Sequence, residues 1–260
     1  MEKFSLLQLR EVFHLEFLKW LGRSVIAADY ALKGGVNLRF FFKSFRYSED
    51  MNLDARSIKV FQLRDAVMGI LGDKKFQDNL RPFGIAGIVT HDAARSKQTE
   101  TTQRFKVHLH SYSGEDLFTK IEFSRRGFNG NAVIEPVEPV ILRAYKMAPL
   151  LVSHYDSYSA VTQKLRALAV RTEIQARDIF DLYVLASQYN PAEKRLCDIR
   201  TGFLSKAYER VFEVEFAQFR DTVVAYLSSE NQAVYDNPKT WEEVRLKVIR
   251  FIEEIKGSNA

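Results

Sequence analysis

Cysteine is nearly absent from this chain of 260 residues, because Cys197 is the only one. A lone cysteine cannot form a disulfide within the chain, which excludes the class of small disulfide-stabilised secreted domains. The chain also lacks any run of about 18 apolar residues, the length that a membrane-spanning helix needs. Its first ten residues lack the basic segment followed by an apolar one that marks a secretory signal. We therefore expect a soluble, cytoplasmic protein with no membrane partner.

A large excess of charge of one sign is also absent. The formal net charge is +5 and the sequence pI is about 9.1. This moderate basic excess fits a polyanionic partner such as RNA or a nucleotide, although many basic proteins bind neither. The hydrophobic fraction of 46% is ordinary for a globular protein, and the length allows one large domain or two small ones.

The spacing of apolar residues predicts helices near the N-terminus and strands in the middle of the chain. Helical spacing covers residues 6–31 and 57–71, and a short helix is expected over 38–42. Short segments of alternating pattern predict strands at residues 47–54, 84–90, 104–111 and 117–124. From about Leu142 onward, the spacing is mostly helical.

A loop rich in glycine and proline, residues 127–139, is the expected domain boundary. We therefore predict an α+β fold, in which residues 1–140 form a mixed sheet with flanking helices. Residues 141–260 are expected to form a helical domain.

A glycine pair, Gly34-Gly35, follows Lys33 directly. Without a Cβ, backbone N–H groups can approach a polyanion closely. A helix that begins after such a turn would also direct its N-terminal N–H groups at a phosphate. The alternative is that the glycine pair only ends the preceding helix.

Acidic and amide side chains alternate soon afterwards, at Asp50, Asn52 and Asp54. In a strand these three side chains point to one face. Placing like charges side by side is unfavourable unless a cation lies among them, and Mg²⁺ takes oxygen ligands of this kind. Together with the glycine pair, this pattern indicates chemistry on a nucleoside triphosphate. The alternative is a solvated edge strand.

Two further groups of residues are candidates for the same chemistry. Glu122 lies in the middle of a predicted strand and would be a third acid at the cation if that strand neighbours residues 47–54. It could equally form an exposed pair with Lys120. In the helical half, Lys164 could offer its charge to a phosphate, and Asp178 and Asp181 share one helix face at i,i+3. An ordinary solvated helix has the same composition.

Three segments, taken in order, resemble the AbiEii/AbiGii-type nucleotidyltransferase toxins of the DNA polymerase β-like superfamily. The first runs from Leu32-Lys33-Gly34-Gly35 to Asp50, and the second is Lys120-Ile121-Glu122-Phe123-Ser124. The third comprises residues 164–168 and 177–182. The resemblance implies a polymerase-β-like sheet and, as its activity, Mg²⁺-dependent transfer of a nucleotide.

The resemblance also implies a role for each matching residue. Those that would contact the triphosphate are Lys33, Gly34, Gly35, Ser48 and Lys164. Those implied in catalysis are Asp50, Glu122, Lys164, Asp178 and Asp181. Those that would hold Mg²⁺ are Asp50, Asn52, Asp54 and Glu122.

One departure from the family pattern concerns the metal. The family usually has Asp-x-Asp, whereas this chain has Asp50-Met51-Asn52. An asparagine offers a carbonyl oxygen without negative charge, so the affinity for Mg²⁺ should fall. Asp54, on the same face, is expected to compensate; otherwise the transferase is weakened or inactive.

The leading hypothesis is therefore a toxin that transfers a nucleotide from an NTP to an RNA, with tRNA and a cognate antitoxin as partners implied by the resemblance. A second hypothesis is a degenerate protein that binds nucleotide, RNA or a protein without turnover. A third is transfer to a protein or a small molecule.

Overall fold

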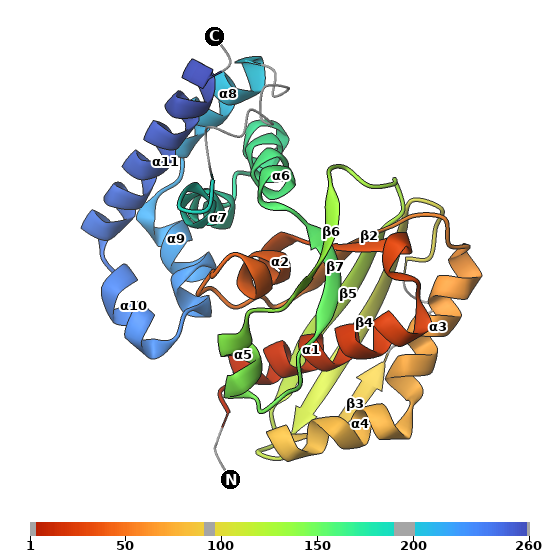
Figure 1. Ribbon diagram of the computed structural model, residues 1–260. Coiled ribbons are helices and arrows are strands. Elements are labelled where there is room, and N and C mark those ends of the chain that lie inside the picture. The colour runs from red at the N-terminus through yellow and green to blue at the C-terminus, as the bar shows by residue number, and fades with distance from the viewer. Residues whose placement is uncertain (1–3, 91–96, 190–200, 259–260) are drawn as a thin grey trace. The chain divides into compact units, whose positions relative to one another are not determined.

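Contacts divide the chain into two units in a computed structural model, which describes residues 4–90, 97–189 and 201–258 (Figure 1). The sheet unit comprises Met1–Phe41 and Tyr47–Tyr155. The helical unit comprises Phe42–Arg46 and Asp156–Ala260. No helix within the described residues is long and apolar enough to cross a membrane.

The sheet unit is built on a mixed sheet of seven strands in the order β3-β4-β5-β2-β1-β7-β6. The strands are β1 Tyr30–Lys33, β2 Met51–Ala55, β3 Ile85–Thr90, β4 Thr102–Ser111, β5 Asp116–Ser124, β6 Ala132–Pro136 and β7 Leu151–Tyr155. The pairs β1–β7 and β2–β5 are parallel, and the other neighbours are antiparallel. Parallel pairs require long crossover connections, so neighbouring strands come from distant parts of the chain.

Helices α1, α3 and α4 pack together over one face of this sheet (Figure 1). The helical elements of the unit are α1 Leu6–Ser24, η1 Ala27–Asp29, α2 Gly34–Phe41, α3 Val60–Gly72, α4 Lys74–Leu80, η2 Arg81–Phe83 and α5 Pro139–Ala144. α1 begins with a capping box between Ser5 and Gln8, which satisfies backbone N–H groups at its start. Its apolar side, which includes Phe13 and Phe17, is fully buried in the core.

The alternation of side chains along β2 and β5 separates an apolar face of the sheet from a polar one. Met51, Leu53 and Ile121 are fully buried in the core under the helices. Asn52 and Glu122 lie between them in sequence and point to the opposite face. The polar face is therefore where the candidate residues of the sheet unit gather.

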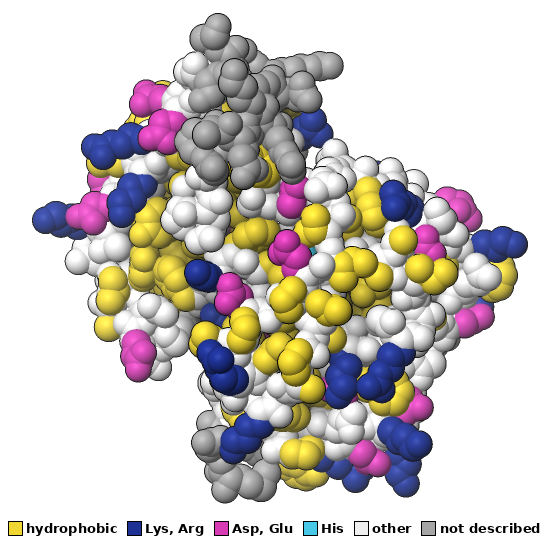
Figure 2. Space-filling view, in the orientation of Figure 1, with side chains coloured by type: hydrophobic (Ala, Val, Ile, Leu, Met, Phe, Trp, Pro, Cys, Tyr) yellow, Lys and Arg dark blue, Asp and Glu magenta, His cyan; other side chains and the backbone are white. Residues whose placement is uncertain are grey.

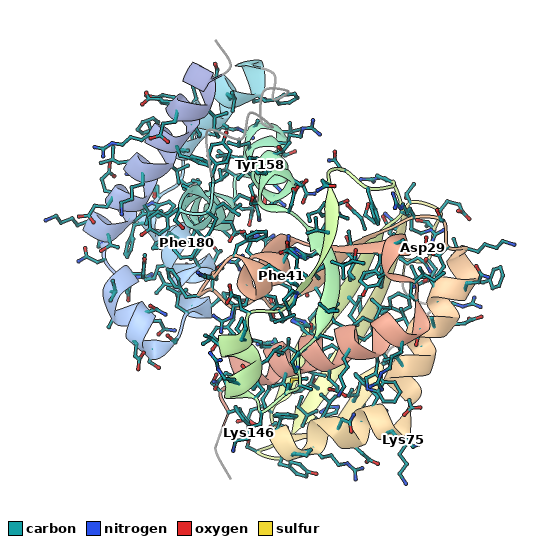
Figure 3. The ribbon with its side chains drawn as sticks, viewed as in Figure 1. Asp29, Phe41, Lys75, Lys146, Tyr158 and Phe180 are labelled. Atoms are coloured by element: carbon teal, nitrogen blue, oxygen red, sulfur yellow. The ribbon has the colours of Figure 1, made fainter. Side chains whose placement is uncertain are left out.

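The helical unit is built around an aromatic core. Its helical elements are α6 Ser157–Val170, α7 Ala176–Ala186, α8 Thr201–Val211, α9 Phe216–Thr222, η4 Val224–Tyr226, α10 Ser229–Tyr235 and α11 Pro238–Ser258. Phe180 of α7 lies at the centre of this unit and is fully buried (Figure 3). The Trp241 ring stacks on Phe219 at 4.3 Å between centroids, and its Nε1 donates to the Val214 carbonyl at 3.1 Å.

The surface of the helical unit carries charges of both signs along α11. Figure 2 shows lysine and arginine side chains interspersed with acidic ones on the edge where this helix lies. Arg245 of α11 forms an ion pair with Glu242 of the same helix. This is the pattern of a solvated helix face.

The predicted fold class is confirmed, because the structure contains a mixed sheet with flanking helices followed by a helical region. The predicted helix over 6–31 is wrong at its end: α1 stops at Ser24, and Tyr30–Lys33 is strand β1. The predicted strand over 47–54 begins only at Met51. The structure starts the short helix at Gly34 rather than at Leu38.

The end of the sheet unit also differs from the expected boundary at residue 140. Strand β6 lies inside the segment predicted as a loop, and β7 lies in the region predicted as helical. Because β7 pairs with β1 and with β6, it belongs to the sheet, and the sheet unit extends to Tyr155.

A fully buried histidine on α1 makes the stability of the sheet unit depend on pH. His14 Nε2 lies 3.1 Å from Thr119 Oγ1 of β5. Burial, and then the charge of Arg10, lower the pKa of His14 to about 3. The folded protein therefore excludes a proton that the unfolded chain accepts below pH 6.5, the ordinary pKa of histidine.

We expect the free energy of unfolding to fall by about 1.4 kcal/mol for each pH unit as the pH drops from about 6.5 towards 3, because of this single group. Urea denaturation at neutral pH and at about pH 5 measures the slope. His14→Gln keeps a hydrogen-bonding side chain but cannot titrate, so it isolates the histidine from the carboxylates. The same slope in both proteins would contradict the prediction.

Candidate active site

The glycine pair lies at the junction of β1 and α2, next to strand β2. Gly34 has φ +71°, a left-handed conformation that is strained for residues with a side chain. A Cβ at Gly34 would lie 3.7 Å from Nδ2 of Asn52. The start of α2, with its N–H groups that have no partner within the helix, therefore lies beside the Asn52 side chain. Gly35 follows as the second residue of the helix and is partly exposed.

A row of polar side chains crosses four strands at this point. Lys33 of β1 is in register with Asn52 of β2, which is in register with Glu122 of β5. Arg104 of β4 is in register with Glu122 on its other side. The strand that carries Glu122 is thus the neighbour of β2, as the metal hypothesis requires, and the roles of these residues remain predictions.

Each carboxylate on the polar face is paired with a cation. Asp50 Oδ2 lies 2.7 Å from Lys120 Nζ, and Asp54 Oδ1 lies 2.5 Å from Lys33 Nζ. Arg104 of β4 donates from Nε to Oε2 of Glu122 on β5 at 2.7 Å. Lysine and arginine side chains therefore relieve the like-charge crowding that the alternating acids suggested. Sequence reasoning missed these partners because they depend on strand register.

Asp54 is fixed within the fold and does not fit the predicted metal role. Its Oδ1 accepts from Lys33, its Oδ2 accepts from the Tyr155 hydroxyl at 2.6 Å, and the residue is only 3% exposed. Burial, and then the hydrogen bond to Asp54, raise the pKa of Tyr155. Asp54 thus ties β2 to β1 and β7, which argues against the expectation that it compensates for Asn52.

Asp50 is the carboxylate with an unused oxygen. It lies just before β2, and its Oδ1 is buried without a hydrogen-bond partner among the described residues. Ser48 precedes it by two positions and is partly exposed. Leaving a buried acceptor unsatisfied is unfavourable, so this oxygen is a position at which a cation would be stabilising.

The donor atoms of the polar face fit a Mg²⁺ ion that takes few of its ligands from the protein. Within the residues that the structure describes, no three His, Cys, Asp or Glu side chains are grouped so as to hold a metal ion. Mg²⁺ often takes only one or two carboxylates, however, and receives its other ligands from water and substrate phosphates. The unpaired Oδ1 of Asp50, the Asn52 amide oxygen and Glu122 are donors of that kind.

The candidate residues of the helical unit form a buried cluster of charges. Lys164 of α6 lies 2.9 Å from Asp178 Oδ1 and 2.5 Å from Asp181 Oδ2, measured from its Nζ. Arg46 donates from Nη2 to both oxygens of Asp181, at 3.0 and 3.2 Å. Arg171 donates to Asp178 Oδ2 at 2.7 Å. The structure therefore brings together all three residues predicted in this half, with two arginines whose pairing the sequence did not reveal.

Burial and charge oppose each other in this cluster. Burial by itself lowers the pKa of Lys164, but the charges of Asp178 and Asp181 together outweigh it and raise that pKa. Burial likewise tends to raise the pKa of Asp181, but Arg46 and Lys164 outweigh it and hold that pKa below its usual range. Lys164 and Asp181 are therefore both charged at neutral pH. Both aspartates are fully buried and contact Lys164.

Comparison with known proteins agrees with this fold. The family model "Nucleotidyl transferase AbiEii toxin, Type IV TA system" matches residues 16–247. The solved structure of JHP933 from Helicobacter pylori is 19% identical, with a TM-score of 0.62 over 98% of this chain and 94% of that one. MenT4, a nucleotidyltransferase toxin from Mycobacterium tuberculosis, is 16% identical, with a TM-score of 0.61 over 100% and 89%.

At these identities, the two structures show a shared fold and nothing more. None of the curated proteins compared with the chain matches it. The family model covers most of both units, from within α1 to within α11. The chain therefore belongs to the AbiEii family of nucleotidyl transferase toxins of type IV toxin–antitoxin systems.

Proposed function

We propose that this chain is a Mg²⁺-dependent nucleotidyltransferase that transfers a nucleotide from an NTP to an RNA acceptor such as tRNA. One observation carries the proposal. Gly34, in a left-handed conformation, starts α2 beside Asn52, and Asp50, two residues before Asn52, has a carboxylate oxygen with no partner among the described residues. The turn would bind the triphosphate and Asp50 would bind the cation, with Asn52 lying between them in the chain and beside Gly34. Family membership supports transferase activity in general.

The residues of the polar face would divide the work between binding and proton transfer. The N–H groups of Gly34 and Gly35 would bind triphosphate oxygens, with Ser48 assisting. Asp50 would hold Mg²⁺ together with the Asn52 amide oxygen and Glu122. The bound ion would supply charge neutralisation for the triphosphate and the departing pyrophosphate.

The reaction itself is an in-line displacement at the α-phosphorus. The acceptor hydroxyl oxygen forms a bond to the α-phosphorus, the bond to the bridging oxygen breaks, and pyrophosphate leaves. Arg104 contacts Oε2 of Glu122, so its Oε1 would serve one of two roles: assisting Asp50 in holding Mg²⁺, or taking the proton of the attacking hydroxyl. Lys164 would contribute a positive charge towards the triphosphate, held in its rotamer by Asp178 and Asp181.

The acceptor and the partner protein are inferred more indirectly. The net charge of +5 favours a polyanionic acceptor, which supports RNA over a protein or a small molecule. The toxin–antitoxin family implies a cognate antitoxin and a nucleotide substrate.

The proposal is tested by incubating the purified protein with each NTP radiolabelled at the α-phosphorus, Mg²⁺ and total tRNA. Label on RNA in a denaturing gel is the expected result. Label on the protein or on a small molecule would replace RNA as the acceptor. Omission of Mg²⁺ should abolish the label.

A second function, nucleotide binding without turnover, is favoured by the paired state of the carboxylates. Lys120, Lys33 and Arg104 already neutralise Asp50, Asp54 and Glu122, and Asn52 brings no charge. In that case nucleotide binding would be measurable by calorimetry, while no NTP would label any acceptor.

Asn52→Asp should strengthen Mg²⁺ binding, because it adds a carboxylate beside Asp50 and restores the Asp-x-Asp pattern. We expect the Mg²⁺ concentration for half-maximal transfer to fall by about tenfold, since ligand charge sets the affinity of such sites. A titration of transfer against Mg²⁺ measures it. Asn237→Asp, at an exposed position before α11, changes the net charge equally and should have no effect. An unchanged midpoint in Asn52→Asp would remove Asn52 from the metal site.

A further inference from the structure

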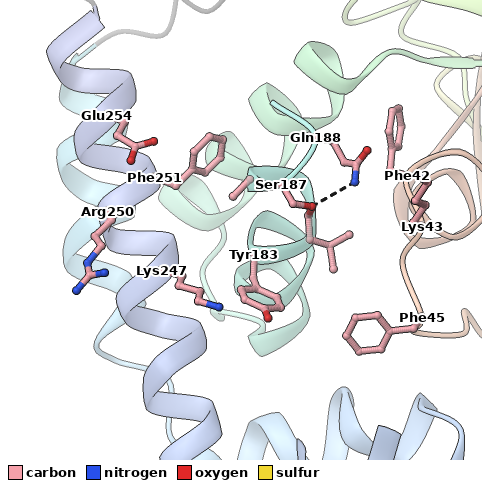
Figure 4. Close-up of a pocket in the computed structure, with 12 residues that line it drawn as sticks. Phe42, Lys43, Phe45, Tyr183, Ser187, Gln188, Lys247, Arg250, Phe251 and Glu254 are labelled. Atoms are coloured by element: carbon pink, nitrogen blue, oxygen red, sulfur yellow. Dashed lines mark hydrogen bonds between the residues drawn. The ribbon is translucent and has the colours of Figure 1, made fainter. Parts of the chain in front are cut away.

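A pocket of about 480 Å³ lies within the helical unit (Figure 4). Three segments line it: residues 42–45, α7 with the two residues after it, and α11. Its volume falls in the range of about 300–1,000 Å³ that is usual for small-ligand sites. The glycine turn and Asp50 are not among its lining residues, and none of the residues that line it has a role in the chemistry described above.

Aromatic side chains make up much of the pocket wall. Phe45 and Tyr183 are partly exposed, so their rings are available to a ligand, whereas Phe251 is buried. Phe45 is held edge-on against Phe180 at 5.3 Å between centroids. Flat, fixed aromatic surfaces of this kind bind nucleobases by stacking, whatever the base.

Three cations and one carboxylate, Glu254, also line the pocket. Lys43, Lys247 and Arg250 are exposed residues of the pocket lining. Figure 4 shows the Lys247 side chain directed at Tyr183, with Nζ 5.3 Å from the ring centroid. Within the described part of the chain, no carboxylate forms an ion pair with any of the three. On the polar face of the sheet, by contrast, Lys33 and Lys120 each form an ion pair with an aspartate.

The backbone at Lys43 is in an unusual conformation. Its φ of 54° is left-handed, which is uncommon for a residue with a long side chain. Such a conformation persists only when its surroundings enforce it, and it is concentrated at ligand-binding sites. Here it keeps Lys43 exposed while Phe42 and Ser44 on either side are buried.

We propose that this pocket binds a single-stranded nucleotide of the acceptor RNA, with its base against Phe45 and Tyr183 and its phosphates contacted by Lys43 and Lys247. RNA combines stackable bases with a regular series of negative charges, which matches an aromatic wall flanked by cations that form no ion pair within the described residues. Arg250 lies at the outer side and adds to the attraction. The inference rests on the proposed function in one respect, that the acceptor is RNA.

Binding of a fluorescent single-stranded RNA and of total tRNA, measured by anisotropy with the full chain, tests the proposal. The double variant Lys247→Gln/Arg250→Gln should bind about tenfold more weakly. Its plot of log Kd against log salt should be less steep by at least about 0.7, because the phosphate contact of Lys247 is lost. The matched control is Arg220→Gln/Lys239→Gln, which removes the same charge from exposed positions of the same unit.

A second pair of variants separates stacking from charge. Tyr183→Leu should weaken RNA binding by about tenfold without changing the salt dependence, because it removes a stacking surface and no charge. Tyr183→Phe retains the ring and should bind like the wild type. Thermal melting of each variant ensures that a loss of binding is not a loss of folding.

RNA affinity that is unchanged in both Lys247→Gln/Arg250→Gln and Tyr183→Leu would overturn the proposal. The proposal would also be overturned if these variants kept their RNA affinity but lost affinity for an acidic protein, because the pocket would then bind a protein partner. The binding assay uses neither NTP nor Mg²⁺, so it is independent of catalysis. If the pocket binds RNA and no nucleotide is transferred, only the proposed function is wrong. If these variants transfer nucleotide with an unaltered KM for RNA, only the proposal about the pocket is wrong.

Discussion

Asp50→Asn is expected to reduce the rate of nucleotide transfer by on the order of 10³-fold, because it removes the negative charge of the carboxylate that we propose as the main ligand of the cation. Oδ1 of Asp50 is buried and has no hydrogen-bond partner among the described residues. Stabilising charge in the transition state of phosphoryl-type transfer contributes several kcal/mol, and each 1.4 kcal/mol corresponds to about a tenfold change in rate. The substitution is isosteric, so folding should be preserved.

The measurement is transfer of label from NTP to RNA at saturating Mg²⁺, with Asp116→Asn as the matched control. Asp116 is half-exposed, contacts His108 and lies at the end of β5 opposite to Glu122. It should retain full activity. If Asp50→Asn stays within a few-fold of the wild type while melting normally, Asp50 does not hold the catalytic cation.

The strands that could be predicted from sequence are those with one buried and one exposed face. β4 and β5 alternate regularly between buried and exposed residues, and the chain shows that alternation directly. β1 and β7 could not be found in this way, because three or four consecutive residues of each are buried. A short strand buried on both faces has the composition of a helix segment, and only pairing with distant strands defines it.

The candidate site was predictable in its composition and not in its pairing. Gly34, Asp50, Asn52 and Glu122 were singled out from spacing and family resemblance, and strand register brings the last two together. The role expected of Asp54 could not be judged from sequence, because the Tyr155 hydroxyl that occupies its second oxygen comes from β7. Such a contact depends on a strand pairing that sequence periodicity does not reveal.

The roles of the aspartates of the helical unit could not be predicted from the sequence either. Family resemblance implied Asp178 and Asp181 in catalysis, and the structure places both carboxylates fully inside a network of cations. A carboxylate in that position contributes to folding and to the orientation of Lys164 at once. Removing it affects both, so activity alone cannot identify its role.

Asp181→Asn is expected to lower the free energy of unfolding of the helical unit by about 3–5 kcal/mol, because it leaves Arg46 and Lys164 buried with too little negative charge. Both oxygens of Asp181 accept from Arg46, and Oδ2 also lies 2.5 Å from Lys164 Nζ. Urea denaturation followed by circular dichroism measures the loss. Asp221→Asn, at an exposed position of the same unit, should change stability by less than about 0.5 kcal/mol.

A compensated variant then separates folding from positioning. Arg46→Met/Asp181→Leu replaces the buried ion pair with apolar side chains of similar size, which commonly restores stability. Lys164 keeps its contact with Asp178 in that protein but loses the one with Asp181. Recovered stability with transfer still impaired would show that Asp181 positions Lys164 for the triphosphate. Recovery of both would make the cluster a structural element alone, and a stable but inactive Asp181→Asn would contradict the structural role argued from burial.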